Sequence, residues 1–295
     1  GGVTDKQPEL LTEALTNLNI DVEQQAFAQA VDRYVRNLLN AQKQFPFYQA
    51  FGLYSDMIRS GNHDTDALVA TAKSLTVADL EALMADVLSR NNVRVFAFGN
   101  YDEASVKQVA KSIAKALPKQ QTDSSYTRSK VWQPKSGEVY VMQKDIDVAD
   151  VAIIDMVYHP TPGYAQKAAA AVLQGHFRTI AFDKLRTEEQ LAYAVGALAR
   201  PLEDYAGLGL YIQTPVKGPK DMQARFDSFK EQYQQELATM DEQTFMQLKN
   251  ATLVSLKEKP KNMNDELGRL ICDWYREDYN FDSRAQLIAA VEKVT

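Results

Sequence analysis

Cysteine and histidine are scarce in this sequence of 295 residues, which contains one cysteine and three histidines. The single cysteine, Cys272, excludes an internal disulfide. It lies in the stretch GRLICDWYRE, which is typical of a helix, so we expect a buried and unreactive thiol. His63, His159 and His176 each lack a second histidine or a glutamate at the spacing that zinc ligands take on a helix. A zinc site built from this chain is therefore not expected.

Long hydrophobic runs and clusters of positive charge are also missing. No apolar segment is long enough to span a bilayer, so a membrane partner is not expected. The formal net charge of −6, with a pI near 5.3, argues against a nucleic-acid partner. The nucleophile motif G-x-S-x-G and a phosphate-binding glycine loop are absent as well. The chain opens with GGVTDKQPELL, without an initiator methionine or a signal peptide, which suggests a piece of a larger protein.

The first part of the chain is typical of a mostly helical segment. Apolar residues at helical spacing predict two helices within residues 8–40, and further helices over 46–61, 64–75, 76–89 and 103–117. In the helix over 76–89, Leu80, Leu83 and Val87 are expected to face inward. The alternating stretch NVRVFAFGN, residues 92–100, predicts a strand. Residues 118–136 are polar and rich in turn formers, which indicates a linker.

Strands dominate the region after the linker. Strands are predicted over residues 138–143, 150–159, 191–200 and 207–214, with a long helix over 164–186. Helices are then expected to begin near Asp221, Asp241 and Asn264, and a last short helix covers residues 283–291. This order predicts an α+β fold, and the group of four strands disfavours a purely helical interaction domain.

A repeat relates the two halves of the chain. Phe27 and Phe245 lie 218 residues apart, as do Asp64 and Asp282, and the following threonines, Thr76 and Thr295, lie 219 apart. Each half would then run through two helices, an Asp-capped short helix and a threonine, although any two helical stretches can be aligned with small gaps. The four strands have no counterpart in the first half, so both copies are expected to be incomplete.

The stretch LRTEEQLAYAV places Arg186 seven residues before Tyr193, where a helix gives way to a strand. A guanidinium and a phenol can both hold a peptide carbonyl or a developing oxyanion. The competing interpretation is structural: Arg186 pairs with Glu188 or Glu189, and Tyr193 occupies a strand position. Residue chemistry alone favours the structural role. The acidic pairs, Glu188 with Glu189 and Glu203 with Asp204, are expected to be solvated charges.

This stretch resembles the LRT-x-EQLGY signature in the last domain of the pitrilysin/insulysin family of zinc metallopeptidases. TDKQPELL, LSRNNVRVFAFGN, and EKPKNMNDE followed by YNFDSR also have counterparts there, in the same order. The resemblance covers essentially the whole chain. It implies the LuxS and mitochondrial-processing-peptidase type of domain, a mixed β-sheet backed by helices. Residues 1–117 would be the rear of the third domain, 118–136 a linker and 137–295 a fourth domain without its last elements.

In this family two halves of one polypeptide close around a peptide substrate. Zinc is bound by an H-x-x-E-H domain in the N-terminal half, which would be this chain's partner. By resemblance, Arg186 and Tyr193 would hold substrate from the opposite wall, and the location would be periplasmic, as for bacterial members. The motif H-x-x-E-H is absent here, so this chain alone is expected to be inactive. Ala192 replaces the glycine before the tyrosine, which adds one methyl group.

Two functions remain open on this resemblance. One is the C-terminal half of a zinc metalloendopeptidase that degrades peptides and small unfolded polypeptides in a closed chamber. The other is a non-catalytic peptide-binding or scaffold protein of the same fold. The residues of this chain do not separate them, because the zinc motif would lie outside it.

Overall fold

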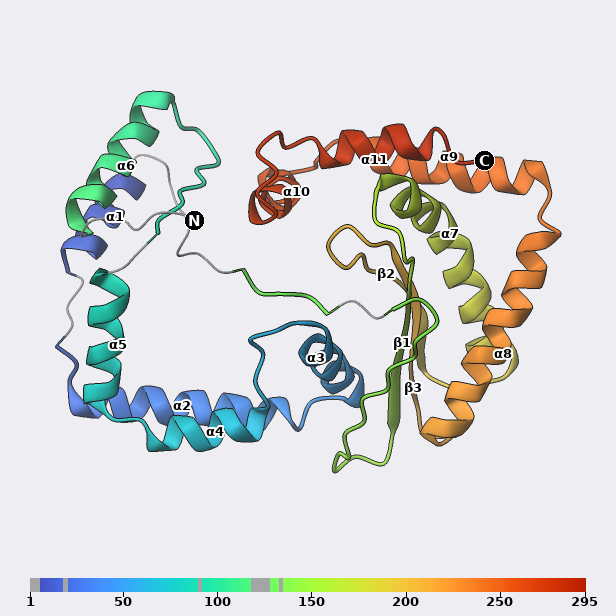
Figure 1. Ribbon diagram of the computed structural model, residues 1–295, viewed down its shortest axis with the longest axis horizontal. Helices are drawn as coiled ribbons and strands as arrows, with labels where there is room; N and C mark the ends of the chain where they lie inside the picture. The colour runs from blue at the N-terminus through green and yellow to red at the C-terminus, as the bar shows by residue number, and fades with distance from the viewer. Residues whose placement is uncertain (1–5, 18–20, 90–91, 118–127, 133–134) are drawn as a thin grey trace. The chain divides into compact units, whose positions relative to one another are not determined.

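The computed structural model describes residues 6–17, 21–89, 92–117, 128–132 and 135–295, which are coloured along the chain in Figure 1. The chain forms two compact units. The first comprises Gly1–Asn40, His63–Ser129 and Asn262–Leu267, and the second comprises Ala41–Asn62, Lys130–Lys261 and Gly268–Thr295. Compact units and evolutionary domains are different divisions of a chain, so the boundaries 1–117, 118–136 and 137–295 stay a prediction.

Helices make up most of the described chain. In order, the elements are α1 (Gln7–Thr16), α2 (Gln24–Ala41), α3 (Pro46–Ile58), α4 (Thr65–Ser74), α5 (Val77–Ser89), α6 (Glu103–Ala116), β1 (Val151–Tyr158), α7 (Tyr164–Phe182), the π-helix η2 (Asp183–Glu188), β2 (Ala194–Ala199), β3 (Gly207–Thr214), α8 (Pro219–Ala238), α9 (Glu242–Lys257), α10 (Met263–Tyr275) and α11 (Ser283–Val291). Among the described residues, no helix combines the length and the apolar character that crossing a membrane requires.

The first unit holds α1, α2, α4, α5 and α6, and its buried cluster joins α2 to α4 through Val35, Val69 and Ala72. The inward face predicted for α5 is wrong at two of its three residues, because Leu83 is 59% exposed and Val87 is 54% exposed, whereas Leu80 is partly buried. The described residues do not cover that side of the helix. The predicted strand over 92–100 is also wrong, since residues 92–98 are irregular. An alternating pattern becomes a strand only where another strand supplies backbone hydrogen bonds.

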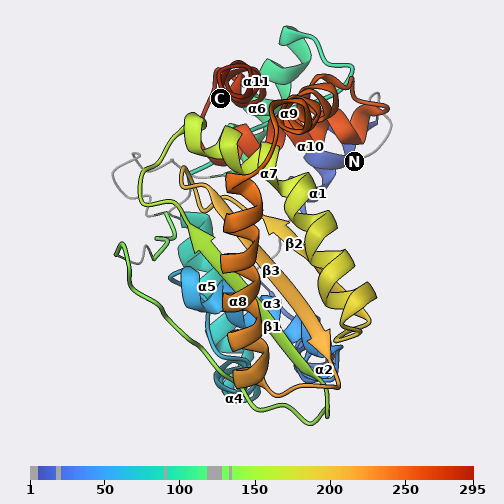
Figure 2. The ribbon, with the colours of Figure 1, turned by 90° about the vertical axis from the view of Figure 1, so that its right-hand side faces the viewer.

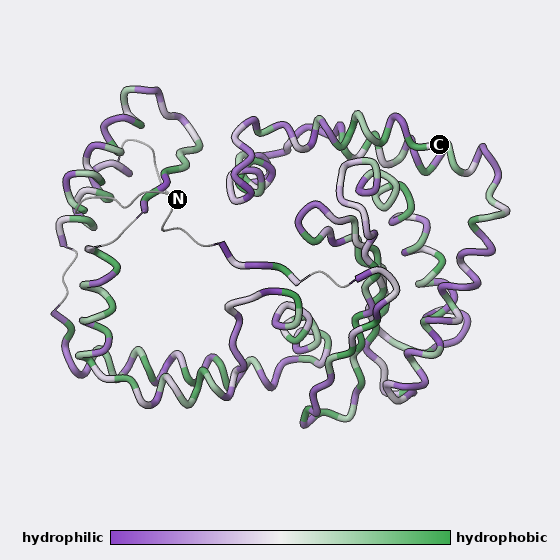
Figure 3. Tube along the Cα trace, in the orientation of Figure 1, coloured by the Kyte–Doolittle hydropathy of each residue, from purple (hydrophilic) through white to green (hydrophobic). Residues whose placement is uncertain are grey.

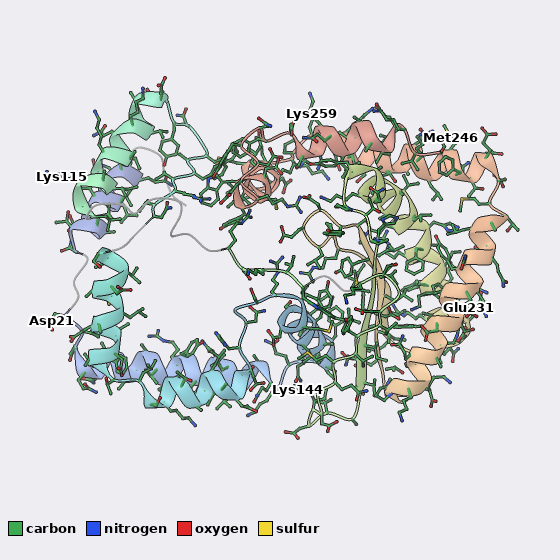
Figure 4. All side chains as sticks on the ribbon, viewed as in Figure 1. Asp21, Lys115, Lys144, Glu231, Met246 and Lys259 are labelled. Atoms are coloured by element: carbon green, nitrogen blue, oxygen red, sulfur yellow. The ribbon has the colours of Figure 1, made fainter. Side chains whose placement is uncertain are left out.

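A three-stranded sheet with the order β1-β3-β2 forms the centre of the second unit. Both pairings are antiparallel, so the sheet is not mixed over the described strands. Three of the four predicted strands are confirmed. The first, over 138–143, is wrong: Val139 is 85% exposed, and this stretch, near the labelled Lys144 in Figure 4, forms no strand. The α+β class is confirmed.

Each face of the sheet is covered by helices, α3 on one face and α7 with α8 on the other (Figures 1 and 2). The alternation in β3 decides which residues face which helices. Leu208, Leu210 and Ile212 pack in the core that includes Phe177 of α7 and Phe226 of α8. In Figure 3 the strands are largely hydrophobic, whereas α8 carries many hydrophilic residues, among them the exposed Glu231 labelled in Figure 4.

Gly207 and Gly209 of β3 lie on the α3 side of the sheet, where neighbouring segments of the same chain approach them closely. A Cβ on Gly207 would lie 2.3 Å from the carbonyl oxygen of Arg200, and one on Gly209 would lie 2.2 Å from that of Asp155. The glycine pair in GLGLYI is therefore explained by packing between strands. On the same face Tyr211 packs its ring 4.8 Å from the ring of Phe47, at the start of α3.

The predicted linker can be followed only in part, because residues 118–127 and 133–134 lie outside the described residues. Val131 forms an isolated bridge with Arg59, and the Trp132 N–H donates to the carbonyl of Ile58 at 2.8 Å. This part of the chain therefore runs beside the end of α3.

The helix boundaries support the predicted repeat. The helices α9, α10 and α11 start 218, 217 and 218 residues after α2, α3 and α4, respectively. The N-cap Asp64 accepts hydrogen bonds from the first turn of α4, whereas Asp282 precedes α11 without a side-chain cap. The two halves thus share the order and spacing of these helices.

Candidate substrate-binding site

Arg186 lies in η2, the short π-helix that continues α7. Single π-turns are rare and frequently mark functional sites. Leu185 is fully buried in the core, whereas its neighbour Arg186 is exposed and lies 4.8 Å from the ring centroid of Phe182. Among the described residues Arg186 forms no ion pair, so the predicted pairing with Glu188 or Glu189 is wrong. The π-turn thus anchors one side chain and presents the next to solvent.

Glu189 fixes the turn that follows η2. Its carboxylate accepts hydrogen bonds from Arg225 of α8, with Nε–Oε2 and NH2–Oε1 distances of 2.8 and 2.5 Å. This bidentate hydrogen bonding lowers the pKa of Glu189. Gln190 has a φ of 51°, and the Leu191 N–H then donates to the Leu185 carbonyl at 2.9 Å. Glu189 therefore forms an ion pair with Arg225 of α8 and is not the solvated charge that was predicted.

Tyr193 lies one residue before β2, so its predicted place within the strand is wrong. Its side chain is 51% exposed. The hydroxyl donates a hydrogen bond to Asp150 Oδ2 and accepts one from Gln213 Nε2. Gln213 also donates to Asp150 Oδ2 at 3.0 Å, which closes a triangle of three polar groups.

Gln213 supports this triangle from β3. It is only 3% exposed, and its Oε1 accepts a hydrogen bond of 3.1 Å from the Phe47 N–H in the first turn of α3. The first N–H groups of a helix have no partner within the helix. Because Oε1 is bound there, the amide nitrogen must face Asp150 and Tyr193. One helix end thereby determines how the tyrosine is held.

The two ionisable groups of the triangle are shifted in opposite directions. The hydrogen bonds from Gln213 and then from Tyr193 lower the pKa of Asp150. The hydrogen bond to Asp150 raises the pKa of Tyr193. At neutral pH, Asp150 is therefore ionised and Tyr193 keeps its proton, as a donor to the carboxylate.

The histidines are engaged locally. His159 Nδ1 accepts a hydrogen bond from the Thr161 N–H at 3.0 Å, and His176 Nδ1 lies 3.0 Å from the Tyr233 hydroxyl. Within the part of the chain that the structure describes, no three His, Cys, Asp or Glu residues are grouped to hold a metal ion. These residues do not fit a zinc ion, and the expectation that its ligands lie outside this chain stays a prediction.

The predicted burial of Cys272 is wrong, because the cysteine is exposed on α10. Ile271 and Trp274 are partly buried, so the helix turns position 272 toward solvent. Its thiol donates only a weak hydrogen bond, at 3.4 Å, to the carbonyl of Gly268. The helix was predicted correctly, but its phase was not.

The second acidic pair is bound by cations and is only partly the solvated charge that was predicted. Glu203 lies 3.6 Å from Arg59, and Asp204 lies 2.8 Å from Lys167. Both acidic side chains remain substantially exposed, so these are surface ion pairs of small energetic weight.

Three members of the site could not be predicted from any pattern in the sequence. Asp150, Gln213 and Phe47 come from three distant parts of the chain and belong to no motif with the tyrosine. The position of Gln213 on the α3 face of β3 follows from the strand alternation, but its partners depend on how α3 packs. Only the three-dimensional fold brings these groups together.

Known proteins with similar sequences point to peptidases. Residues 172–271 match the family described as "PQQ synthase PqqF-like, C-terminal lobe domain 4". Protease 3 of Salmonella typhi is 25% identical over 297 residues, covering 100% of this chain and 31% of the relative. A Schizosaccharomyces pombe relative named as a zinc protease is 21% identical over 301 residues, covering 99% of this chain and 31% of that protein. The chain thus spans about a third of the length of these relatives.

Solved structures show the same fold. The crystal structure of pitrilysin matches with a TM-score of 0.81 and 24% identity, over 100% of this chain and 31% of that one. A peptidase M16 inactive domain from Pseudomonas fluorescens matches with a TM-score of 0.67 and 15% identity, over 99% of this chain and 70% of that one. The periplasmic protease PqqL from Escherichia coli matches with a TM-score of 0.58 and 12% identity, over 93% of this chain and 30% of that one.

Fold and similarity together define the class: a helix-rich α+β protein with the fold of pitrilysin and of the peptidase M16 inactive domain. Within that class, the chain is similar to the pitrilysin/insulinase family, and the matches fall in the C-terminal half of its members. This confirms the family resemblance that the LRTEEQLAY stretch indicated.

Proposed function

We propose that this chain is the non-zinc-binding, C-terminal part of a zinc metalloendopeptidase that degrades peptides and small unfolded polypeptides in a closed chamber. The zinc ligands lie in the N-terminal half of the same polypeptide. Arg186 and Tyr193 bind the substrate backbone from the opposite wall. The names of the relatives, Protease 3 and a zinc protease, support this assignment.

The observation that carries the proposal is the way Tyr193 is presented. An aromatic side chain that served only packing would be expected to bury its ring, yet Tyr193 is 51% exposed. At the same time its hydroxyl is held by Asp150 and by the buried Gln213. An exposed group whose orientation is fixed in advance costs little further ordering when it binds a ligand. The neighbouring Arg186 is exposed without a carboxylate partner among the described residues and offers a planar set of donors.

The experiment is Tyr193→Phe in the full-length protein that the gene encodes. In the complex the Tyr193 hydroxyl would donate to a substrate carbonyl or the developing oxyanion in place of Asp150. Loss of one such donor typically costs on the order of 10²–10³ in rate. We expect a loss of kcat/KM of this order with unchanged zinc content, measured on a quenched fluorescent peptide and by atomic absorption. Tyr34→Phe is the matched control, since Tyr34 is 47% exposed on α2 in the other unit. A wild-type kcat/KM for Tyr193→Phe would end the proposal.

A second function is supported by one comparison. The similar Pseudomonas fluorescens structure is named an inactive domain, which fits a non-catalytic peptide-binding or scaffold protein. Sequencing the gene upstream for H-x-x-E-H distinguishes the two, and metal analysis of the full-length protein tests the result. In either case the 295-residue chain alone is expected to show no peptidase activity.

The periplasm is the proposed location. The similarity to the periplasmic protease PqqL supports it. Cell fractionation, with enzymes of known compartment as markers, tests this assignment.

A further inference from the structure

Asp150 stands immediately before β1 and is partly buried, 43 residues away from Tyr193 in sequence. Its Oδ2 receives two hydrogen bonds, one from the Tyr193 hydroxyl and one, 3.0 Å long, from Gln213 Nε2. An ionised carboxylate only accepts hydrogen bonds and is a stronger acceptor than an amide. The tyrosine proton is therefore directed to one fixed atom.

Gln213 in turn holds Asp150 Oδ2 in place. Its amide oxygen is bound to the Phe47 N–H of α3 at 3.1 Å, so the amide cannot turn over without losing this bond. The support runs from the first turn of α3 through a buried side chain to the carboxylate and the phenol. Tyr193 is only 20 residues from Gln213 in sequence but lies outside β2, so no strand pairing fixes its ring directly.

We propose that Asp150 is a positioning residue for substrate binding, which together with Gln213 holds the Tyr193 hydroxyl in its working place and acts only through Tyr193. This proposal rests on the function proposed above. Asp150 itself need not touch the substrate. Without it the tyrosine ring, half exposed and anchored by Gln213 alone, would sample several orientations.

The test is a double-mutant cycle in the full-length protein, with kcat/KM for a quenched peptide as the readout. Asp150→Ala is expected to lower kcat/KM about 10–100-fold, the loss typical of a misplaced binding group. In a Tyr193→Phe background the same substitution should cause no further loss. Asp147→Ala is the matched control, because Asp147 is an exposed aspartate in the same bend.

A second measurement does not depend on activity. With 3-fluorotyrosine incorporated at position 193, ¹⁹F NMR follows the titration of this phenol. Asp150→Ala should move its midpoint to lower pH, since the hydrogen bond to the carboxylate holds the pKa of Tyr193 above its ordinary value. Asp147→Ala should leave the midpoint in place. The same measurement shows whether the variant has kept its fold.

Each other outcome overturns the proposal in a different way. Losses that multiply in the double variant would show that Asp150 acts independently of Tyr193. An unchanged kcat/KM in Asp150→Ala, or an unchanged ¹⁹F midpoint, would show that it does not position the phenol. A wild-type kcat/KM in Tyr193→Phe, together with an Asp150-dependent ¹⁹F midpoint in the protein that carries 3-fluorotyrosine at position 193, would refute the proposed function itself. The contact between Asp150 and Tyr193 would then stand without a role in substrate binding.

Discussion

Replacing Glu189 with glutamine should destabilise the second unit in a pH-dependent way. The substitution weakens two hydrogen bonds to Arg225, of 2.8 and 2.5 Å, and leaves a guanidinium whose NH1 is already buried without a partner. A hydrogen bond to a charged group contributes about 1.5–3 kcal/mol. The Glu189 side chain is 34% exposed and Arg225 16%, so solvent screening reduces the effect. We expect a loss of about 1–2 kcal/mol in the free energy of unfolding at neutral pH.

The pH dependence follows from the direction of the pKa shift. The hydrogen bond from Arg225 lowers the pKa of Glu189 in the folded chain. The Glu189 carboxylate therefore contributes fully to the free energy of unfolding above its pKa in the unfolded chain, which is about 4.3. This contribution is lost as the pH falls through the lower pKa of the folded chain. The wild-type advantage over Glu189→Gln should be present at pH 7 and should shrink progressively below about pH 4.

Urea denaturation followed by tryptophan fluorescence measures this unit selectively, because both tryptophans, Trp132 and Trp274, belong to it. Glu188→Gln is the matched control, since Glu188 is an exposed glutamate one residue earlier. A stability difference that stays constant from pH 7 to pH 3.5 would refute the role of the carboxylate charge. Equal losses in the two variants would refute the role of Arg225.

Two further predictions concern the strands and the cysteine. Gly209→Ala should lower the free energy of unfolding by about 1–3 kcal/mol or more, since its Cβ would lie 2.2 Å from the Asp155 carbonyl oxygen. Gly52→Ala in α3, with no atom within 4 Å of its Cβ, should be neutral or stabilising; similar urea midpoints for both variants would contradict the packing argument. Cys272 should react fully with a thiol reagent in the native protein at a rate near that of the denatured chain, and strong protection would contradict its exposure.

Helices were predicted better than strands from the sequence, for a physical reason. A helix satisfies its hydrogen bonds within one segment, so caps and apolar spacing mark it locally. The predicted start of a helix at Thr76 is confirmed by the hydrogen bonds between Thr76 and Asp79, and the first residue of α9 follows the predicted Asp241. Strands need partners elsewhere in the chain. The alternating stretches over 92–100 and 138–143 have the pattern of strands but are irregular or bent where the structure describes them.

Only some residues of the candidate site could be predicted from the sequence. Arg186 and Tyr193 were found through the LRTEEQLAY stretch, and their proposed roles in substrate binding stay a prediction. The residues that support Tyr193 could not be found, because hydrogen bonds between distant segments leave no spacing pattern in the chain. Exposure was also misjudged at Cys272, since the phase of a helix relative to the core depends on its packing.

The hydrogen bond between α3 and Gln213 affects how this protein can be divided. Residues 137–295 contain the whole sheet and both site residues, so they look like a self-sufficient piece. Cutting there would remove α3, which contributes the buried Tyr54 and Ile58 to one face of the sheet. It would also remove the Phe47 N–H that fixes the Gln213 amide. The smallest unit that can present Tyr193 correctly must therefore include a helix encoded about ninety residues before the predicted domain begins.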